Sequence, residues 1–309
     1  MFSVKPFKSV LDLIKAFPTE QACIDHLEWI RWDGNVVSPF DANSKVYKCK
    51  NNRYKCTSTN KYFNVLTDTI FENTKISLQT WFVAIYLFTV HKKGISSYQL
   101  AEELNITQKT AWFLLSRIRY AMEHKSFIKE MEGTVQIDET FVGGKNKNRH
   151  KDKKVANSQG RSYKDKTPVL GMVDEEGKVK CFVVPDTKRE TVQPLVRQNV
   201  KEGSTIFTDE WHAYQGLNRY YDHQYVDHGR GQYVDGDITT NQIENFWSHF
   251  KRSIIGIYHV VSRKHLQKYA DEMTFRYNFR EKSVNDRFNI FLGATKDKRL
   301  TYSMLIGHA

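Results

Sequence analysis

The order of strand-like and helix-like segments in the C-terminal half constrains the fold of this chain more than any other feature. Short apolar or alternating segments typical of strands occupy residues 134–142, 168–174, 178–184, 204–208 and 223–226. An amphipathic helix is predicted at 189–200, after the third strand, and a long helix follows the fifth. Strands interrupted by helices in this order indicate a mixed α/β domain built on a central sheet.

The long helix includes the sequence TTNQIENFWSHFK, residues 239–251. Its apolar side chains recur at steps of three and four, which predicts one buried helix face formed by Ile243, Phe246, Trp247, Phe250 and Ile254. Glu244 and Lys251 lie two helical turns apart, so both project from the same flank of that helix. From the residues alone, this pair is either part of a surface ion-pair network or half of a metal and phosphate site.

Three acidic residues stand out by their positions on these elements. Asp138 lies within the first strand, Asp209 directly follows the fourth, and Glu244 opens the long helix. Adjacent parallel strands would place the aspartates close together, and a helix packed on the sheet would bring the glutamate to them. Three converging carboxylates repel unless divalent cations neutralise them, and a Mg²⁺ pair about 3.5–4 Å apart supports phosphoryl transfer in polymerases and nucleases. The neighbouring Glu139 and Glu210 are expected to point the other way, because successive strand residues face opposite sides.

The charge of the chain indicates a polyanionic partner. The 309 residues carry a formal net charge of +12, and each phosphate that Lys or Arg neutralises releases condensed counterions. A hydrophobic content of 40% excludes a disordered protein. Residues 145–154, KNKNRHKDKK, are predicted to form a mobile loop, either a solvated hairpin tip or a clamp for a phosphate backbone. The basic residues expected to bind DNA there are Lys145, Lys147, Arg149, Lys151, Lys153 and Lys154.

A helix-turn-helix pattern precedes the sheet. Residues 97–104 form a short predicted helix, 105–107 a turn with Thr107 as N-cap, and 108–124 a longer helix. In DNA-binding proteins with this motif the second helix enters the major groove, which would direct Gln108, Lys109 and Thr110 at bases or phosphates. The alternative is a simple helical pair.

Residues 35–71 resemble a zinc ribbon that has lost its ligands. A ribbon needs two Cys-x-x-Cys knuckles, but the four ligand positions here hold Ser38, Asp41, Cys56 and Thr59. We therefore expect no zinc, and a hairpin turning at Asn51-Asn52 that is held by aromatic packing. The aromatic side chains predicted to hold it are Tyr47, Tyr54, Tyr62, Phe63 and Phe71.

The remaining features predict a cytoplasmic protein. Four cysteines are too few for a disulfide framework in a chain of this size. The longest apolar run, residues 81–90, has half the length needed to span a bilayer.

Three blocks of sequence resemble those of a known family. IDETFVGG, IFTDEWHAY and the run from NQIENFWSHFK to TFRYN resemble the motifs of a DDE-type bacterial insertion-sequence transposase. The similarity is to the branch with an ISXO-two-like catalytic domain behind a zinc ribbon and a helix-turn-helix, and covers about residues 35–280. It implies a ribonuclease H-like fold, two Mg²⁺ or Mn²⁺ ions, and cutting and rejoining of DNA at element ends.

The resemblance also implies roles for single residues. Asp138, Asp209 and Glu244 become the catalytic metal-binding triad, and Lys251 becomes the basic residue that holds a DNA phosphate. Some members carry Asn as the third ligand, so Asn241 and Asn245 remain alternatives to Glu244. Arg252 lies two turns after Asn245 and joins the DNA-binding set.

The chain is expected to divide into three regions. Residues 1–75 hold the N-terminal helices and the degenerate ribbon, 76–130 the helix-turn-helix region, and 131–309 the catalytic domain with C-terminal helices. Joining two element ends in concert requires at least a dimer on DNA, with no membrane partner. Two other functions stay open, a catalytically silent DNA-binding protein derived from a transposase and a ribonuclease H-like nuclease that cuts without joining.

Overall fold

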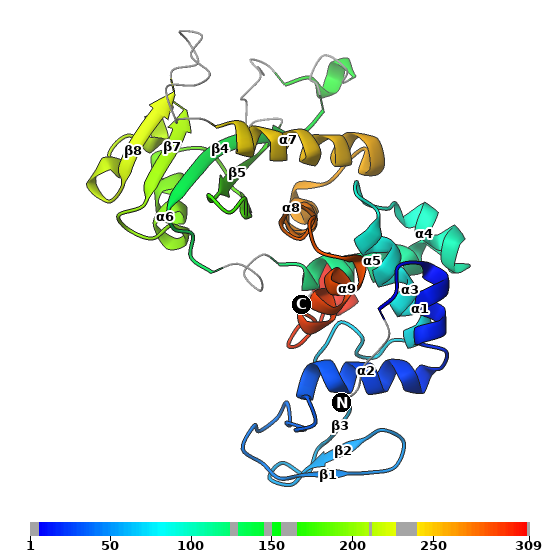
Figure 1. Ribbon diagram of the computed structural model, residues 1–309. Coiled ribbons are helices and arrows are strands. Elements are labelled where there is room, and N and C mark those ends of the chain that lie inside the picture. Colours follow the sequence, from blue (N-terminus) through cyan, green and yellow to red (C-terminus); the bar gives the residue numbers. More distant parts are fainter. Residues whose placement is uncertain are drawn as a thin grey trace. The chain divides into compact units, whose positions relative to one another are not determined.

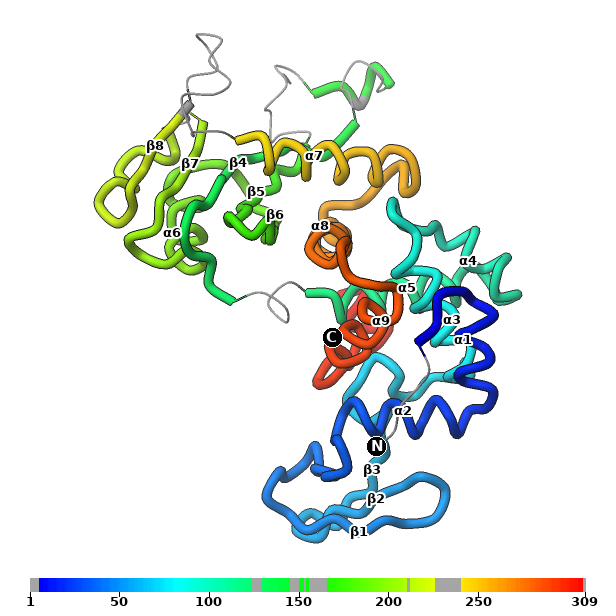
Figure 2. Tube along the Cα trace, viewed as in Figure 1, coloured from blue at the N-terminus to red at the C-terminus, as the bar shows by residue number. Residues whose placement is uncertain are grey.

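The chain forms two compact units. The computed structural model describes residues 6–123, 129–144, 150–155, 166–209, 212–226 and 240–307, and its path is traced in Figures 1 and 2. The first unit contains residues 1–122 and 281–309, and the second contains residues 123–280. The sequence-based division placed the last segment with the catalytic domain, whereas the structure groups it with the N-terminal residues.

The first unit is mainly helical. Its helices are α1 (Val10–Ala16), α2 (Glu20–Trp32), α3 (Leu78–Val90), α4 (Ser97–Leu104), α5 (Gln108–Ala121), α9 (Val284–Gly293) and α10 (Tyr302–Ile306). Thr107 caps α5 by accepting the Thr110 N–H at 3.2 Å, and α5 ends three residues before the predicted end at 124. Inside the unit, Phe288 of α9 packs edge-on against Phe7 and Phe82. This aromatic packing explains why the C-terminal segment belongs to the first unit.

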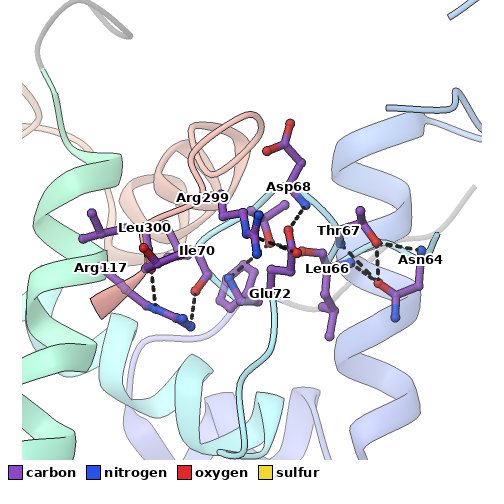
Figure 3. Close-up of polar contacts among 12 residues, drawn as sticks. Asn64, Leu66, Thr67, Asp68, Ile70, Glu72, Arg117, Arg299 and Leu300 are labelled. Carbon is purple, nitrogen blue, oxygen red and sulfur yellow. Dashed lines mark hydrogen bonds and ion pairs between the residues drawn. The ribbon is translucent and has the colours of Figure 1, made fainter. Parts of the chain in front are cut away.

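Polar contacts of two arginines and a glutamate join the C-terminal segment to the loop before α3 (Figure 3). The guanidinium of Arg117 on α5 donates to the Ile70 carbonyl at 2.9 Å and to the Leu300 carbonyl at 3.2 Å. Arg299 pairs with Glu72 at 3.1 Å, and Glu72 also accepts the Asp68 N–H. Because these partners are far apart in sequence, no local pattern could have placed the last residues in this unit.

A three-stranded antiparallel sheet packs beside α2. It consists of β1 (Val46–Lys48), β2 (Tyr54–Cys56) and β3 (Tyr62–Phe63), in that order. Tyr54 and Phe63 are buried, and Trp32 of α2 packs edge-on against both rings. Tyr47 and Tyr62 are 60% and 51% exposed, so the prediction that they help to hold this region is wrong. The reason is strand alternation, which turns these two side chains away from Trp32.

Hydroxyl groups surround the Cys56 thiol. Ser38, Ser44, Ser58 and Thr59 hydrogen-bond to it, and the Ser58 hydroxyl also donates to Asp41 at 2.6 Å. Burial raises the pKa of the thiol, but the four hydrogen bonds outweigh burial and lower it to about 6. The polar groups at this position therefore stabilise one another through hydrogen bonds.

We predict that the purified protein carries far less than one zinc ion per chain. One thiolate among hydroxyls does not supply the soft tetrahedral ligand set that structural zinc requires. Elemental analysis of metal-depleted protein re-exposed to zinc would measure this. The matched control is the triple variant Ser38→Cys, Asp41→Cys and Thr59→Cys, which should take up about one ion. Stoichiometric zinc in the natural sequence would contradict the prediction.

The second unit is built on a mixed five-stranded sheet. Its strands are β4 (Thr134–Val142), β5 (Thr167–Val173), β6 (Val179–Val183), β7 (Thr205–Asp209) and β8 (Asp222–Val226). The spatial order is β6-β5-β4-β7-β8, with β4 antiparallel to β5 and parallel to β7 (Figures 1 and 2). This arrangement confirms the predicted mixed α/β class and is compatible with a ribonuclease H-like fold.

Helices cover the two faces of this sheet. Val192 and Val196 of α6 (Arg189–Asn199) pack with Ile137 and Met172 on one face. On the other face, α7 (Asn241–Ser253) and α8 (Arg263–Asn278) pack against Val173 of β5 and its neighbours. The predicted inner face of α7 is confirmed, because all its apolar side chains are buried. After its last residue, α7 continues into one π-helical turn, Ile254–Tyr258.

No helix in the described ranges combines the length and the apolar character needed to cross a membrane.

Candidate metal centre

Two aspartates meet where the parallel strands β4 and β7 diverge. The pairing of these strands places Gln136 beside Phe207, so Asp138 and Asp209 both come two residues after a paired position. One oxygen each of Asp138, Glu139 and Asp209 lie within 4.8 Å of one another. Asp209 is buried and Asp138 is half-buried. The geometry therefore brings three carboxylates to one point.

The expectation that Glu139 lies away from this point is wrong. Tyr214, which belongs to the core on the α6 face, donates its hydroxyl to Glu139 Oε1 at 2.6 Å. Glu139 thus leaves β4 on the face opposite Asp138, as strand alternation requires, but its longer side chain still brings a carboxylate oxygen into the group. Burial, and then the charge of Glu139, raise the pKa of Tyr214, so the phenol remains a donor.

The surroundings of Asp138 disfavour its negative charge. Burial contributes most to a pKa that rises from 3.8 to about 6, and repulsion from Asp209 comes next. The Glu139 N–H and the Trp247 indole N–H lower the pKa by donating to the carboxylate, and Glu244 raises it slightly. Oxygen ligands that repel one another are the donor set that a hard divalent cation neutralises. The residues present therefore fit Mg²⁺ or Mn²⁺.

Strand β4 fixes the start of α7. The side-chain oxygen of Gln136 accepts the N–H groups of Gln242 and Ile243, at 3.0 and 3.3 Å. These are two of the N–H groups that a helix cannot satisfy by itself. One turn further on, the Trp247 indole donates to Asp138 Oδ2 at 2.9 Å. The helix is thus connected to the same face of β4 by two polar contacts.

Glu244 lies outside the group of three carboxylates. It is exposed, and its Oε1 accepts the Thr240 hydroxyl at 3.1 Å. Asn241 and Asn245, the alternatives for the third ligand, are also exposed. Lys251 is exposed on the flank of α7 that carries Glu244. The identity of the third ligand accordingly remains a prediction.

The residues predicted to bind DNA have different surroundings. Arg252 is exposed and donates to Ser248 at 2.6 Å. On α5, Gln108 donates to Ser97 at 2.9 Å, Thr110 shares a hydrogen bond with Thr107, and Lys109 is exposed. Lys151 and Lys154 are exposed. Of the residues named from the sequence, Lys145, Lys147, Arg149, Glu210 and the side chain of Lys153 lie outside the part of the chain that the structure describes.

Sequence reasoning missed four residues that shape the centre. Gln136, Tyr214 and Trp247 form the hydrogen bonds described above, and Gly171 leaves room for the indole. Only Gln136 gave a usable signal, because a polar residue two positions before Asp138 on a strand shares its face. Apolar spacing places Trp247 in the core and gives no sign of the role of its indole N–H.

We predict that the metal-free protein loses stability as the pH rises from about 4 to about 6. The native state holds a proton on Asp138 up to a pKa of about 6, whereas the ordinary value is 3.8. Between these values the native state binds more protons than the unfolded state, so the free energy of unfolding falls with pH. Urea denaturation at several pH values, in the presence of a chelator, would measure this fall. Asp138→Asn should reduce this fall, and the exposed Asp222→Asn should not. If the free energy of unfolding falls equally with pH in both variants, the fall does not come from Asp138.

The second unit is thus a mixed α/β unit whose carboxylate group could hold a divalent cation, and similar proteins identify its family. Residues 130–278 match the model of the ISXO2-like transposase domain. The chain is 30% identical over 254 residues to an uncharacterized protein in transposable element ISH50 of Halobacterium salinarum, an overlap of 77% of this chain and 84% of that protein. It is also 30% identical over 102 residues to an uncharacterized transposase-like protein of Haemophilus influenzae, covering 33% of this chain and 81% of that protein.

The chain belongs to the insertion-sequence transposases with an ISXO2-like transposase domain. The resemblance of the three motif blocks is thereby confirmed, and the family implies DNA as a partner.

Proposed function

We propose that the chain catalyses metal-dependent cleavage and strand transfer at insertion-sequence ends. The observation that carries this proposal is the meeting of Asp138, Glu139 and Asp209 just beyond the paired part of the parallel strands β4 and β7, beneath a helix that carries Glu244. This group brings one carboxylate oxygen each of Asp138, Glu139 and Asp209 to within 4.8 Å of one another. Burial, and then the charge of Asp209, raise the pKa of Asp138, and such shifts are common at functional sites.

Asp138, Asp209 and Glu244 would hold the metal ions, with Mg²⁺ or Mn²⁺ as the fitting cations. Bound in pairs, such ions activate the attacking oxygen and stabilise the leaving oxygen of an in-line phosphoryl displacement. Water would be the nucleophile for cleavage, and the freed 3′-hydroxyl would attack target DNA in the same site. Glu139 is a further possible ligand, because its carboxylate lies within the group.

The surrounding residues keep the acids in place. The Trp247 indole fixes Asp138 from the side of α7, while Tyr214 holds Glu139 from the side of α6. Gln136 ties the first turn of α7 to β4, which limits how far Glu244 can move from the aspartates. Partners of this kind orient metal ligands and commonly affect activity by 10- to 100-fold, as an order of magnitude.

DNA binding outside the centre would use basic residues in both units. Lys251 would bind a phosphate next to the reacting one, with Arg252, Lys151 and Lys154 contributing nearby charge. In the first unit, α4 and α5 would act as a helix-turn-helix, with Lys109 as its exposed cation. Since two ends are joined in concert, the active species would be at least a dimer on DNA.

A strand-transfer assay tests the proposed function. Labelled duplexes carrying the element end are incubated with the protein and Mg²⁺, Mn²⁺ or chelator, and the products are separated by size. We expect nicked and joined products with either metal and none with chelator. Nicking without joining would favour a nuclease, and binding without any cleavage would favour a silent DNA-binding protein.

We predict that Lys251→Ala weakens binding to the element end and lowers the salt dependence of that binding. One lost phosphate contact should reduce the slope of log affinity against log salt by about 0.9. Fluorescence anisotropy at several salt concentrations measures the slope. The matched control is Lys201→Ala. Lys201 lies before the start of β7 and pairs with Glu132 at 2.9 Å, whereas Asp209 of the acidic group is at the other end of that strand. If both variants show the same slope of log affinity against log salt, Lys251 does not contact a DNA phosphate.

A further inference from the structure

A cavity in the first unit has no part in the function described so far. It lies between α2, the loop that follows α2, and the strands β1 and β2, and its volume is about 700 Å³. Cavities of this size are typical of small-molecule sites. Its walls include acidic, aromatic and basic side chains, among them Glu28, Trp29, Trp32, Lys45, Lys48 and Tyr54.

The aromatic side chains offer a surface for a planar group. Trp29 is 40% exposed, and its indole stacks on His26 with ring centroids 5.8 Å apart and an interplanar angle of 26°. Trp32 and Tyr54 pack edge-on with centroids 5.2 Å apart. An exposed indole held by a stacked neighbour can take up a flat ligand with little loss of side-chain entropy.

Glu28 supplies an acceptor that lacks a donor. Its Oε2 accepts the Tyr54 hydroxyl at 3.0 Å, whereas its Oε1 is buried without a hydrogen-bond partner in the described part of the chain. Burial, and then the bond to Glu28, raise the pKa of Tyr54, so the phenol remains a donor to Oε2. The last torsion of a glutamate is soft, so a small rotation would present Oε1 to an N–H group in the cavity. A buried acceptor without a donor is destabilising, so a ligand that donates to it gains affinity.

Basic side chains complete the lining. Lys45 and Lys48 are exposed at the β1 side of the cavity, and the Lys48 ammonium lies 6.0 Å from the centroid of the Tyr54 ring. Asp25, a second acid in the lining, already accepts the Gln21 amide at 2.7 Å. An arginine or lysine from another protein would use the acids and rings but would be repelled by the two lysines. A nucleotide uses all three kinds of group.

We propose that this cavity binds one unstacked DNA nucleotide, with the base against Trp29, its exocyclic amine donating to Glu28, and its phosphate at Lys45 and Lys48. The inference rests on the proposed action of the chain on DNA. Cytosine and adenine present such an amine, whereas thymine presents carbonyl oxygens on both sides of its single N–H. The cavity would therefore read one base at a distorted or single-stranded position, in addition to any groove contacts made elsewhere.

Binding of short single strands to the full chain tests this proposal. Labelled oligonucleotides of about six deoxycytidines, deoxyadenosines or thymidines are titrated in chelator, with anisotropy as the readout. We expect cytosine and adenine strands to bind about tenfold more tightly than thymine strands, since one base contact gives about this discrimination. Glu28→Gln should abolish the preference, because an amide can donate as well as accept. Trp29→Ala should weaken binding of all three by about tenfold, and Trp29→Phe should restore part of it.

Tyr47→Ala is the matched control, since Tyr47 is an exposed aromatic residue of β1 outside the lining. It should bind as the natural sequence does. Equal binding of all three strands, an unchanged preference in Glu28→Gln, or tighter binding of an arginine-rich peptide than of DNA would each overturn the proposal. Asp138→Asn should leave this binding unchanged. If Asp138→Asn blocks strand transfer but no base preference exists, only the cavity proposal fails. If the preference exists but the natural sequence transfers no strands with either metal, the proposed function fails instead.

Discussion

Asp138→Asn and Asp209→Asn are expected to abolish cleavage and strand transfer while leaving binding to element ends intact. An amide oxygen coordinates a divalent cation without neutralising it, and losing the several kcal/mol that the ion supplies corresponds to about a 10³-fold lower rate. The same variants should melt at a higher temperature than the natural sequence in chelator, because each removes one of the repelling charges. Quantified strand transfer, anisotropy and thermal melting measure the three properties.

The control for this experiment is Asp222→Asn, an exposed aspartate at the start of β8 that should keep full activity. If Asp138→Asn or Asp209→Asn still transfers strands, the two aspartates do not form the catalytic metal centre. The third ligand is resolved by four further variants in the same assay. Glu244→Gln should behave like the aspartate variants if it binds metal, whereas a larger loss in Asn241→Ala, Asn245→Ala or Glu139→Gln would assign that role to the residue concerned.

Gly171→Ala is expected to displace α7 and to reduce both stability and activity. Gly171 pairs with Asp138 across β4 and β5. A Cβ atom there would lie 2.5 Å from Cζ2 of Trp247 and 2.9 Å from Cδ1 of Ile243, closer than real contacts allow. Overpacking of this kind is typically destabilising by about 1–3 kcal/mol. Since the same indole donates to Asp138, its displacement should also lower strand transfer by about tenfold or more.

Two further variants separate crowding from the lost hydrogen bond. Trp247→Phe removes both the outer ring and the indole donor, so Gly171→Ala in that background should regain stability without regaining activity. Gly256→Ala is the control, because an added Cβ there meets no atom within 4 Å. Urea denaturation and strand transfer measure the two effects. If Gly171→Ala is as stable and active as the natural sequence, α7 does not depend on this close approach.

The predicted elements were recovered well because their signals are local. Apolar spacing located α6 and the buried face of α7, and alternation located the strands of the central sheet to within about two residues. Residue type and position alone predict Thr107 as the N-cap of α5, and it accepts the expected N–H. The placement of Asp138 beside Asp209 followed from one assumption, that their strands are adjacent and parallel, which the pairing confirms.

The errors concern side chains whose partners are distant in sequence. Glu139 was assigned from strand alternation, yet the length of its side chain brings it back to the acids on the other face. Tyr47 and Tyr62 were expected to pack, but Trp32 of a preceding helix occupies the buried side of the hairpin. Chain order places α9 with the catalytic domain, whereas its Phe288 packs with Phe7 and with Phe82 of α3.

The sequence by itself therefore determined the class of fold, the two aspartates and the family, since spacing and motif order are properties of the chain. The tertiary structure decided how the acids are held. Gln136 meets the start of α7 across 106 residues, Trp247 meets Asp138 across 109, and Tyr214 meets Glu139 across 75. Such contacts depend on how sheet and helices pack, and packing joins residues that no local periodicity relates.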